Sequence, residues 1–242
     1  MGTSQKVGGI AALIGAATTL LGAAVFAALL APKGLGSTHP DPRRVVALLA
    51  GNQAAMRLWY LIIYLALGVC LIFLSLALHG RLKAGSPVLA QAVTVTGLVW
   101  AVLVIVVGTL SIIDLGTVVK LYGDNPAQAA TVWLTLNSVE TGLGGGGGET
   151  VVSGLWLLLL SWAALRARAL PRVLNYLGVA TGAAGILSVL ALTDLTYVYG
   201  LGLIIWFVWL GIVMLRRSSA SVAWKPATAH TVPDPGVRVE SC

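Results

Sequence analysis

Six long apolar segments alternate with shorter polar ones along the chain. Their approximate bounds are 7–31, 58–78, 88–113, 150–165, 173–193 and 197–215. At about 1.5 Å per residue, helices of these lengths reach across most or all of a bilayer core of roughly 30 Å. The weakly alternating segments of about ten residues that mark a transmembrane barrel are absent. The pattern therefore predicts an all-α, polytopic membrane helix bundle with about six transmembrane helices.

The segment 126–143 is amphipathic rather than uniformly apolar. Pro126 suits a helix start and Gly142 a helix end. The apolar residues at helical spacing are Ala129, Trp133, Leu136, Val139 and Leu143. Because the segment is too polar to span, we expect an amphipathic helix at the outer interface, or one that re-enters the membrane.

The two ends of the chain contrast in polarity. The run 7–31 is longer than the roughly 7–15 residues of a signal-peptide core, so we expect a retained first span. The last 25 residues, 218–242, are mostly polar and contain prolines, a composition that is common in disordered chain ends. We expect a membrane bundle over 1–217 and a disordered cytoplasmic tail over 218–242.

Composition supports the membrane assignment and charge gives an orientation. The chain is 58% hydrophobic and 10% charged with a mean hydropathy of +0.93, which excludes a soluble domain, a disordered chain and a disulfide scaffold. The net charge is +7, and ten of the fifteen Lys and Arg residues fall on inner segments if both termini are inside. The positive-inside rule thus predicts a multi-pass cell-membrane protein with both termini cytoplasmic, and we expect no nucleic-acid partner.

Acidic residues gather on the predicted outer side. The six that precede the tail are Asp41, Asp114, Asp124, Glu140, Glu149 and Asp194. Counting about 20 helical residues from the inner ends places Asp114 and Glu149 near the outer boundary of the hydrocarbon. An ionisable group there is costly unless it faces the bundle interior, a cavity or a partner such as Arg57 or Lys120.

Helical phase places polar groups of neighbouring elements on shared faces. Ser111 and Asp114 lie on one face of the third span, and Trp133, Asn137 and Glu140 lie on one face of the amphipathic helix. We expect a pocket between the third span, the fourth span and that helix. The candidate catalytic residues are Asp114, Glu149 and Glu140. The candidate substrate-binding residues are Arg57, Trp59, Tyr60, Ser111, Trp133, Asn137 and Trp156.

Simpler interpretations remain open for the same acids. Asp114 could form a structural ion pair with Arg57 or Lys120, and Glu149 could only favour the N-terminus of its helix. The run Gly144–Gly148 lacks the Lys-Ser/Thr that a phosphate-binding loop requires, so a flexible or closely packed hinge is expected there.

Missing residues exclude several chemistries. None of the three histidines lies inside a span, which argues against bis-histidine haem and di-iron sites. The sequence has no Cys-x-x-Cys and no aspartate cluster of the kind that holds magnesium diphosphate. We expect no metal and no organic cofactor, which leaves carboxylate, hydroxyl and aromatic chemistry.

The glycine run, the Glu149-Thr-Val-Val-Ser-Gly-Leu-Trp156 stretch after it, and the Leu170-Pro-Arg172 step before a glycine-rich span resemble a known family. It is the bacterial integral-membrane family catalogued as domain of unknown function four-three-eight-six. The resemblance would cover most of 7–217. It implies a six-span helical fold and no established activity, so it assigns no catalytic residue.

These features leave three functions open. The first is a cofactor-free acid/base enzyme, of isomerase or cyclase type, acting on a lipophilic small molecule that enters from the outer leaflet. The alternatives are a structural or accessory membrane subunit and a small transporter. The expected partners are the lipid bilayer, a lipophilic small molecule, and a second copy or another membrane subunit.

Overall fold

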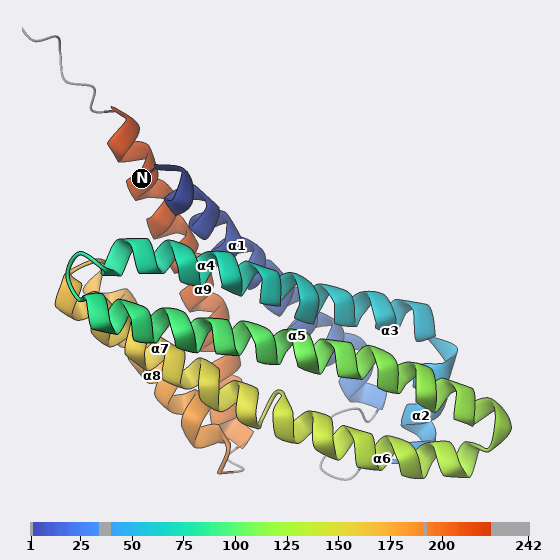
Figure 1. The fold of residues 1–242 in the computed structure, drawn as a ribbon. Helices are drawn as coiled ribbons and strands as arrows, with labels where there is room; N and C mark the ends of the chain where they lie inside the picture. Colours follow the sequence, from blue (N-terminus) through green and yellow to red (C-terminus); the bar gives the residue numbers. More distant parts are fainter. Residues whose placement is uncertain (1, 34–39, 191–192, 224–242) are drawn as a thin grey trace, which may run out of the picture.

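The computed structural model describes residues 2–33, 40–190 and 193–223 of the chain, and every regular element in that part is helical. The helices are α1 (Gly2–Val25), α2 (Pro42–Gly51), α3 (Gln53–Tyr60), α4 (Leu67–Leu82), α5 (Pro87–Asp124), α6 (Pro126–Leu143), α7 (Gly148–Ala167), α8 (Arg172–Ser188) and α9 (Thr193–Ala223) (Figure 1). Two π-helical segments occur, η1 (Phe26–Leu30) after α1 and η3 (Leu61–Ala66) between α3 and α4, and the 3-10 turn η2 (Ala31–Lys33) follows η1. The predicted all-α class is confirmed.

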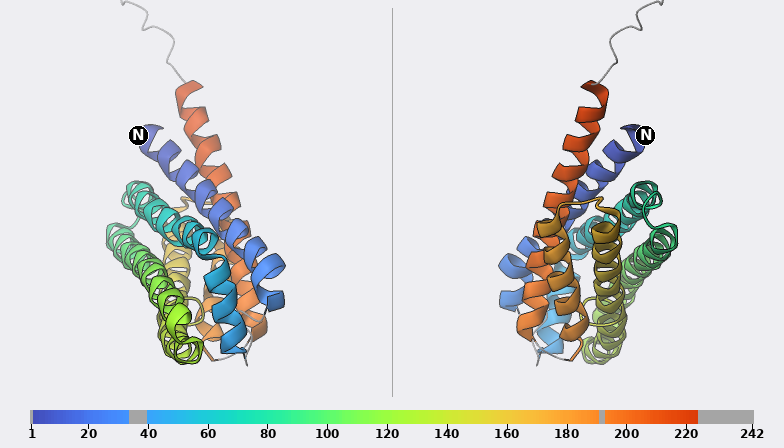
Figure 2. Two further views of the ribbon diagram at one scale, coloured as in Figure 1. Left: turned by 90° about the vertical axis from the view of Figure 1, so that its right-hand side faces the viewer. Right: turned by 90° about the vertical axis from the view of Figure 1, so that its left-hand side faces the viewer.

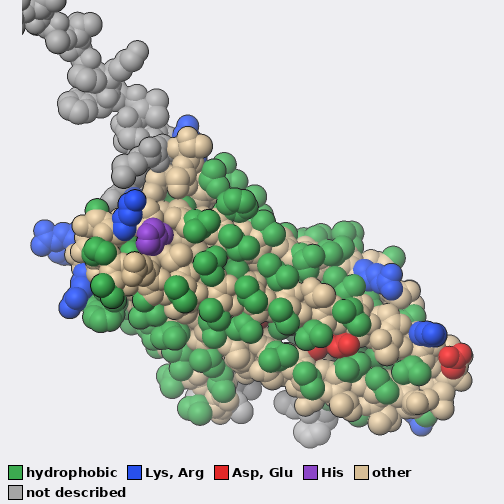
Figure 3. Space-filling model, in the orientation of Figure 1, with side chains coloured by type: hydrophobic (Ala, Val, Ile, Leu, Met, Phe, Trp, Pro, Cys, Tyr) green, Lys and Arg blue, Asp and Glu red, His purple; other side chains and the backbone are tan. Residues whose placement is uncertain are grey.

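Five helical stretches are long and apolar enough to cross a membrane. They are Thr3–Lys33, Gln53–Leu82, Pro87–Asp124, Pro126–Ala167 and Leu195–Arg216. These stretches contain five of the six predicted spans. The sixth, 173–193, coincides with α8, whose 17 residues fall short of the roughly 20 that cross a bilayer. Apolar side chains cover much of the outward surface, as expected where the surrounding solvent is lipid (Figure 3).

Helix α5 organises the bundle. Its 38 residues extend for about 57 Å, nearly twice the thickness of a bilayer core. Helices α4 and α7 pack against it, and so do α2, α3 and α6. The first half of α5 belongs to one buried cluster, which includes Trp100, Trp156, Trp206 and Phe207. Its second half belongs to another cluster, which includes Val45, Met56, Leu115, Val118 and Trp133.

Helix starts follow local sequence signals. Three helices carry a proline in their first turn, where the missing N–H costs nothing. Asp41 caps α2 by accepting from the backbone N–H of Arg43, and Asn125 caps α6 by accepting from that of Gln128, both at 3.1 Å. These caps explain why α6 begins at Pro126, as the sequence predicted.

The two ends of the molecule differ. The start of α1 and the end of α9 lie at the same end as the α4–α5 and α7–α8 connections; we call this the terminal end (Figures 1 and 2). The α5–α6 connection, α2 and α3 lie at the opposite end, which we call the far end. The predicted tail, 218–242, starts within α9, which ends at Ala223, and its remainder lies outside the described residues.

Helix α6 has the predicted bounds, Pro126 to Leu143, but its inward face is only partly the predicted one. It packs along α5 and leads through the glycine run into α7 (Figure 1). Trp133 is buried as expected, whereas Val139 is 54% exposed and Glu140 lines a cavity on the inner side. The reason is that lipid accepts an apolar side chain and not a carboxylate, so the second half of α6 turns its polar side inward.

Candidate functional site

The carboxyl groups of Asp114 and Glu140 meet between α5 and α6. The Glu140 carboxyl lies close to that of Asp114, and Ser111 lines the same small cavity as both acids. Ionised carboxylates only accept hydrogen bonds, so a bond between these two acids requires a proton on one of them. The Ser111 hydroxyl faces the same cavity, beside the two carboxyl groups. The arrangement is two carboxyl groups held close together, which a shared proton would bond to each other.

Helical spacing brings these groups together. Ser111 and Asp114 are three residues apart on α5, and Trp133, Asn137 and Glu140 follow one face of α6, as the sequence predicted. Packing α6 against α5 then turns the two faces toward each other. A cavity of about 20 Å³ lies at this contact, enough for one water molecule.

A larger groove of about 230 Å³ opens beside the carboxyl pair. It is lined by Phe26, Trp59, Tyr60, Tyr64, Val107, Ser111, Trp133, Asn137, Glu140, Thr141 and Gly145. Aromatic rings dominate this lining, and those of Trp59 and Tyr60 lie 5.3 Å apart between centroids. Acidic side chains reach the surface within an otherwise apolar face beside α5 (Figure 3). The groove therefore combines aromatic rings with polar groups, and of the two paired acids Glu140 lines it while Asp114 lines the small cavity beside it.

Both π-helical segments border this groove. Phe26 is the first residue of η1, and Tyr64 belongs to η3. A π turn re-aims the side chains that follow it and occurs frequently at functional sites. The sequence analysis missed Phe26 and Tyr64, although Tyr64 lies four residues after Tyr60 and thus on the same helix side. Nothing in the composition of either segment marks a π turn.

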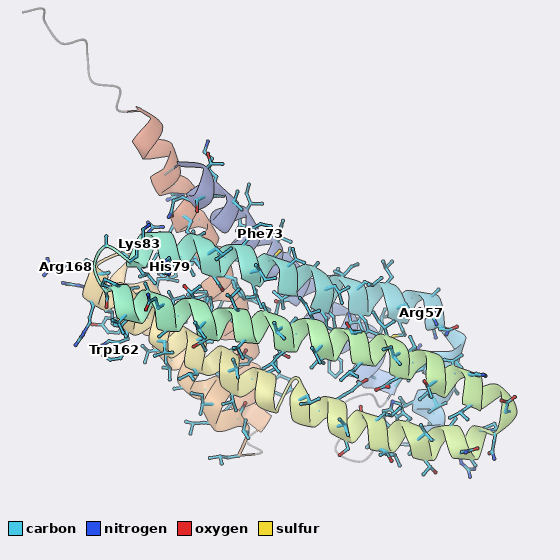
Figure 4. The ribbon with its side chains drawn as sticks, in the orientation of Figure 1. Arg57, Phe73, His79, Lys83, Trp162 and Arg168 are labelled. Carbon is cyan, nitrogen blue, oxygen red and sulfur yellow. The ribbon has the colours of Figure 1, made fainter. Side chains whose placement is uncertain are left out.

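Arg57 stands outside both cavities. It is exposed on α3 at the far end, with its guanidinium against Gly116 of α5 (Figure 4). Within the described part of the chain, the one ion pair at 4.0 Å or less joins Arg44 to Asp41. Asp114 therefore has neither of the cationic partners that the sequence offered, Arg57 and Lys120.

Glu149 and Trp156 belong to a different region of the bundle. The Trp100 indole donates to Glu149 Oε1 at 3.1 Å, and Trp156 is fully buried with its ring centroid 5.3 Å from that of Trp100. Trp100 precedes Asp114 by about 21 Å along the axis of α5. The structure thus brings together Asp114 and Glu140 of the three candidate catalytic acids and leaves Glu149 at the core, where Trp156 packs as well.

The glycine run forms a tightly packed turn. Gly146 has a φ of +104°, and a side chain on Gly147 would collide with the backbone of Thr141 and Gly142. The N–H of Gly146 donates to Thr150 Oγ1 at 2.8 Å, which closes the turn. The sequence left a flexible or a closely packed hinge open here, and the structure contains a closely packed turn that leads from α6 into α7.

The comparisons with known proteins give one family. Residues 7–218 match the model of the family described as Domain of unknown function (DUF4386). No curated protein and no solved structure matches the chain. Within the described residues, no group of three or more His, Cys, Asp or Glu side chains could hold a metal ion.

Proposed function

The chain belongs to the DUF4386 family, a family of unknown function, and from its groove we propose that it binds a lipophilic small molecule and moves a proton on it. The reaction class is cofactor-free isomerisation. One carboxylate of the pair removes a proton from carbon, and the carboxylic acid beside it returns one at another carbon. Protonation of a double bond by the same acid would instead start a cyclisation. The observation that carries the proposal is the closeness of Asp114 to Glu140, whose side chain lines the groove.

The carboxyl pair has both forms that acid/base chemistry needs. A proton shared between two adjacent carboxyl groups leaves one acid and one base a few ångströms apart. No cation in the described part of the chain forms an ion pair with either acid. No fixed positive charge therefore holds either carboxyl group in its ionised form, so a proton can move onto or off either of them.

The rest of the groove suits an apolar substrate with one polar group. Trp59, Tyr60 and Trp133 supply aromatic surface, and Trp59 Nε1 is buried without a hydrogen-bond partner among the described residues. An unsatisfied buried donor is costly, and an oxygen of a bound molecule would satisfy it. Trp59 would thus orient the polar group, while the exposed apolar faces around the groove offer a route in from the membrane.

The experiment is solvent-deuterium exchange. The protein is placed in nanodiscs made from the total lipid extract of its host, incubated in D₂O, and the extracted lipophilic molecules are analysed by mass spectrometry. Proton transfer to carbon predicts deuterium in one class of molecule, and Glu140→Gln or Asp114→Asn should abolish the incorporation. Asp124→Asn, at the last residue of α5, is the matched control and should retain it.

Two results would contradict the enzyme. One is the absence of deuterium on carbon in any molecule that co-purifies with the unchanged protein. The other is equal incorporation in the Glu140→Gln and Asp124→Asn variants, which would mean that Glu140 takes no part.

A small carrier is the second candidate, and the position of Glu149 favours it. This carboxyl is bonded by Trp100 inside the bundle and has no ion pair in the described part of the chain. Intramembrane acids of this kind mark proton relays in transporters. In proteoliposomes a carrier predicts substrate-coupled proton flux that Glu149→Gln blocks and Glu140→Gln leaves unchanged. An accessory subunit predicts that neither variant changes any flux or turnover.

A further inference from the structure

A second cavity lies at the terminal end of the bundle, remote from the carboxyl pair. It has a volume of about 220 Å³ and is lined by Ala164, Leu165, Arg168, Leu170, Arg172 and Asn175. These residues come from the last turn of α7, the α7–α8 connection and the first turn of α8. Two exposed arginines and a buried asparagine therefore contribute to the lining of one small cavity.

The connection that shapes this cavity is held in an unusual conformation by its own residues. Arg168 ends α7 with a φ of +49°, the one positive φ among the described residues other than glycine. Glycine is the usual residue at such a helix end because it has no side chain to strain. Asn175 is 1% exposed, and its Nδ2 donates to the carbonyl of Leu170 at 3.4 Å, which fixes the loop against α8. An arginine thus occupies a position that backbone conformation alone would assign to glycine.

Among the described residues, the lining of the cavity contains two arginines and no acidic side chain. The first turn of α8 contains no acidic residue, and no side chain caps its N–H groups. Within the described residues, neither Arg168 nor Arg172 forms an ion pair at 4.0 Å or less. Two arginines beside an uncapped helix start form a typical environment for an oxyanion.

We propose that this cavity binds a phosphate group, and that the phosphate belongs to an anionic phospholipid. The position of the cavity along the bundle supports a lipid, rather than a soluble molecule, as the source of the phosphate. Trp162, at the same end of α7, is 48% exposed, and the Arg166 guanidinium lies 5.1 Å from the centroid of its ring (Figure 4). Exposed tryptophan with arginine is typical of the headgroup region of a membrane. The cavity lies beside this belt, where lipid phosphates are found.

The test uses substitutions that remove charge without straining the fold. Arg168→Gly removes one guanidinium and places the favoured residue at a positive φ, so it should not destabilise the α7–α8 turn. Arg172→Gln removes the other. Arg166→Ala is the matched control because it removes a positive charge from the same helix end but not from the cavity lining.

Phosphatidylglycerol binding to the purified protein is measured by native mass spectrometry, with phosphatidylcholine as the zwitterionic reference. We expect the unchanged protein to retain phosphatidylglycerol preferentially, and Arg168→Gly and Arg172→Gln each to weaken that binding about tenfold. Arg166→Ala should bind as the unchanged protein does, and added inorganic phosphate should not displace the lipid.

Three results would overturn the proposal. An equal loss of phosphatidylglycerol binding in Arg166→Ala would mean that general surface charge attracts the lipid. Unchanged binding in both cavity variants would mean that the cavity is not the site. Displacement of the lipid by millimolar inorganic phosphate would assign the cavity to a soluble phosphate instead.

Discussion

At the scale of single residues, the pairing of Asp114 with Glu140 should lower the stability of the fold while serving the proposed proton transfer. Two carboxyl groups in contact need a shared proton, whereas an amide in place of one of them donates to the other directly. Active sites commonly keep such destabilising arrangements because their function requires them.

This conflict gives a stability prediction. Glu140→Gln should leave the free energy of unfolding unchanged or raise it by about 1 kcal/mol, because the new amide bonds Asp114 without a shared proton. Thermal unfolding in detergent measures the effect, with Asp124→Asn as control. Marked destabilisation by Glu140→Gln would mean that the acid is a structural element rather than one kept for chemistry.

Glu149 depends on Trp100 in a way that a second tryptophan can test. Trp100→Phe removes the donor to a partly buried carboxyl and should cost about 1 kcal/mol more than Trp156→Phe. Trp156 is a suitable control because it is equally buried and its Nε1 has no partner among the described residues. Equal losses of unfolding free energy in chemical denaturation would show that the Trp100–Glu149 bond contributes nothing.

At the scale of elements, the sequence predicted what hydrophobic period and helix caps determine. The bounds of α6 follow from Pro126 and the polar cap before it, and the shared face of Ser111 and Asp114 follows from helical spacing. The sequence did not predict that Val139 points outward from α6. Helical periodicity shows that a helix has two different faces, but it does not show which of them is covered by lipid.

Other elements escaped prediction for different physical reasons. α5 continues to Asp124, beyond the end predicted at 113, because its second half is buried by α2, α3 and α6 rather than by lipid. The π turns at η1 and η3 have no known sequence signature here, so the participation of Phe26 and Tyr64 could not be foreseen. The separation of Glu149 from Glu140 depends on the angle of the glycine turn, which only tertiary packing sets.

That glycine turn supplies a prediction of its own. Gly147→Ala should cost more than about 2 kcal/mol, because the added carbon would overlap backbone atoms of Thr141 and Gly142. Gly142→Ala is the control, since nothing lies within 4 Å of the added atom and alanine favours helix. Thermal unfolding of both variants measures the difference, and similar midpoints would mean that the turn can relax.

At the scale of the whole molecule, the two ends are chemically unlike. The far end gathers the carboxyl pair, the groove and the second core cluster, and the terminal end gathers arginines around a small cavity. The excess of Lys and Arg on that end also underlies the predicted topology, with both termini cytoplasmic.

Cysteine labelling checks the topology. In a background with Cys70→Ser and Cys242→Ser, we expect Lys120→Cys to react with an impermeant maleimide in intact cells. Arg168→Cys should react only after the membrane is opened, because the end of α5, which contains Lys120, and the end of α7, beside Arg168, lie at opposite ends of the bundle (Figure 1). Labelling of Arg168→Cys from outside would reverse the assigned orientation.

The most direct measurement is an experimental structure of the protein in nanodiscs of native lipid, read at the groove beside α5 and α6. We expect density for an apolar molecule in contact with Trp59 and Tyr60, with a reacting atom about 3.5 Å or less from a carboxyl oxygen of Glu140 or Asp114. An empty or water-filled groove in which the two carboxyl groups have separated toward cations would contradict it.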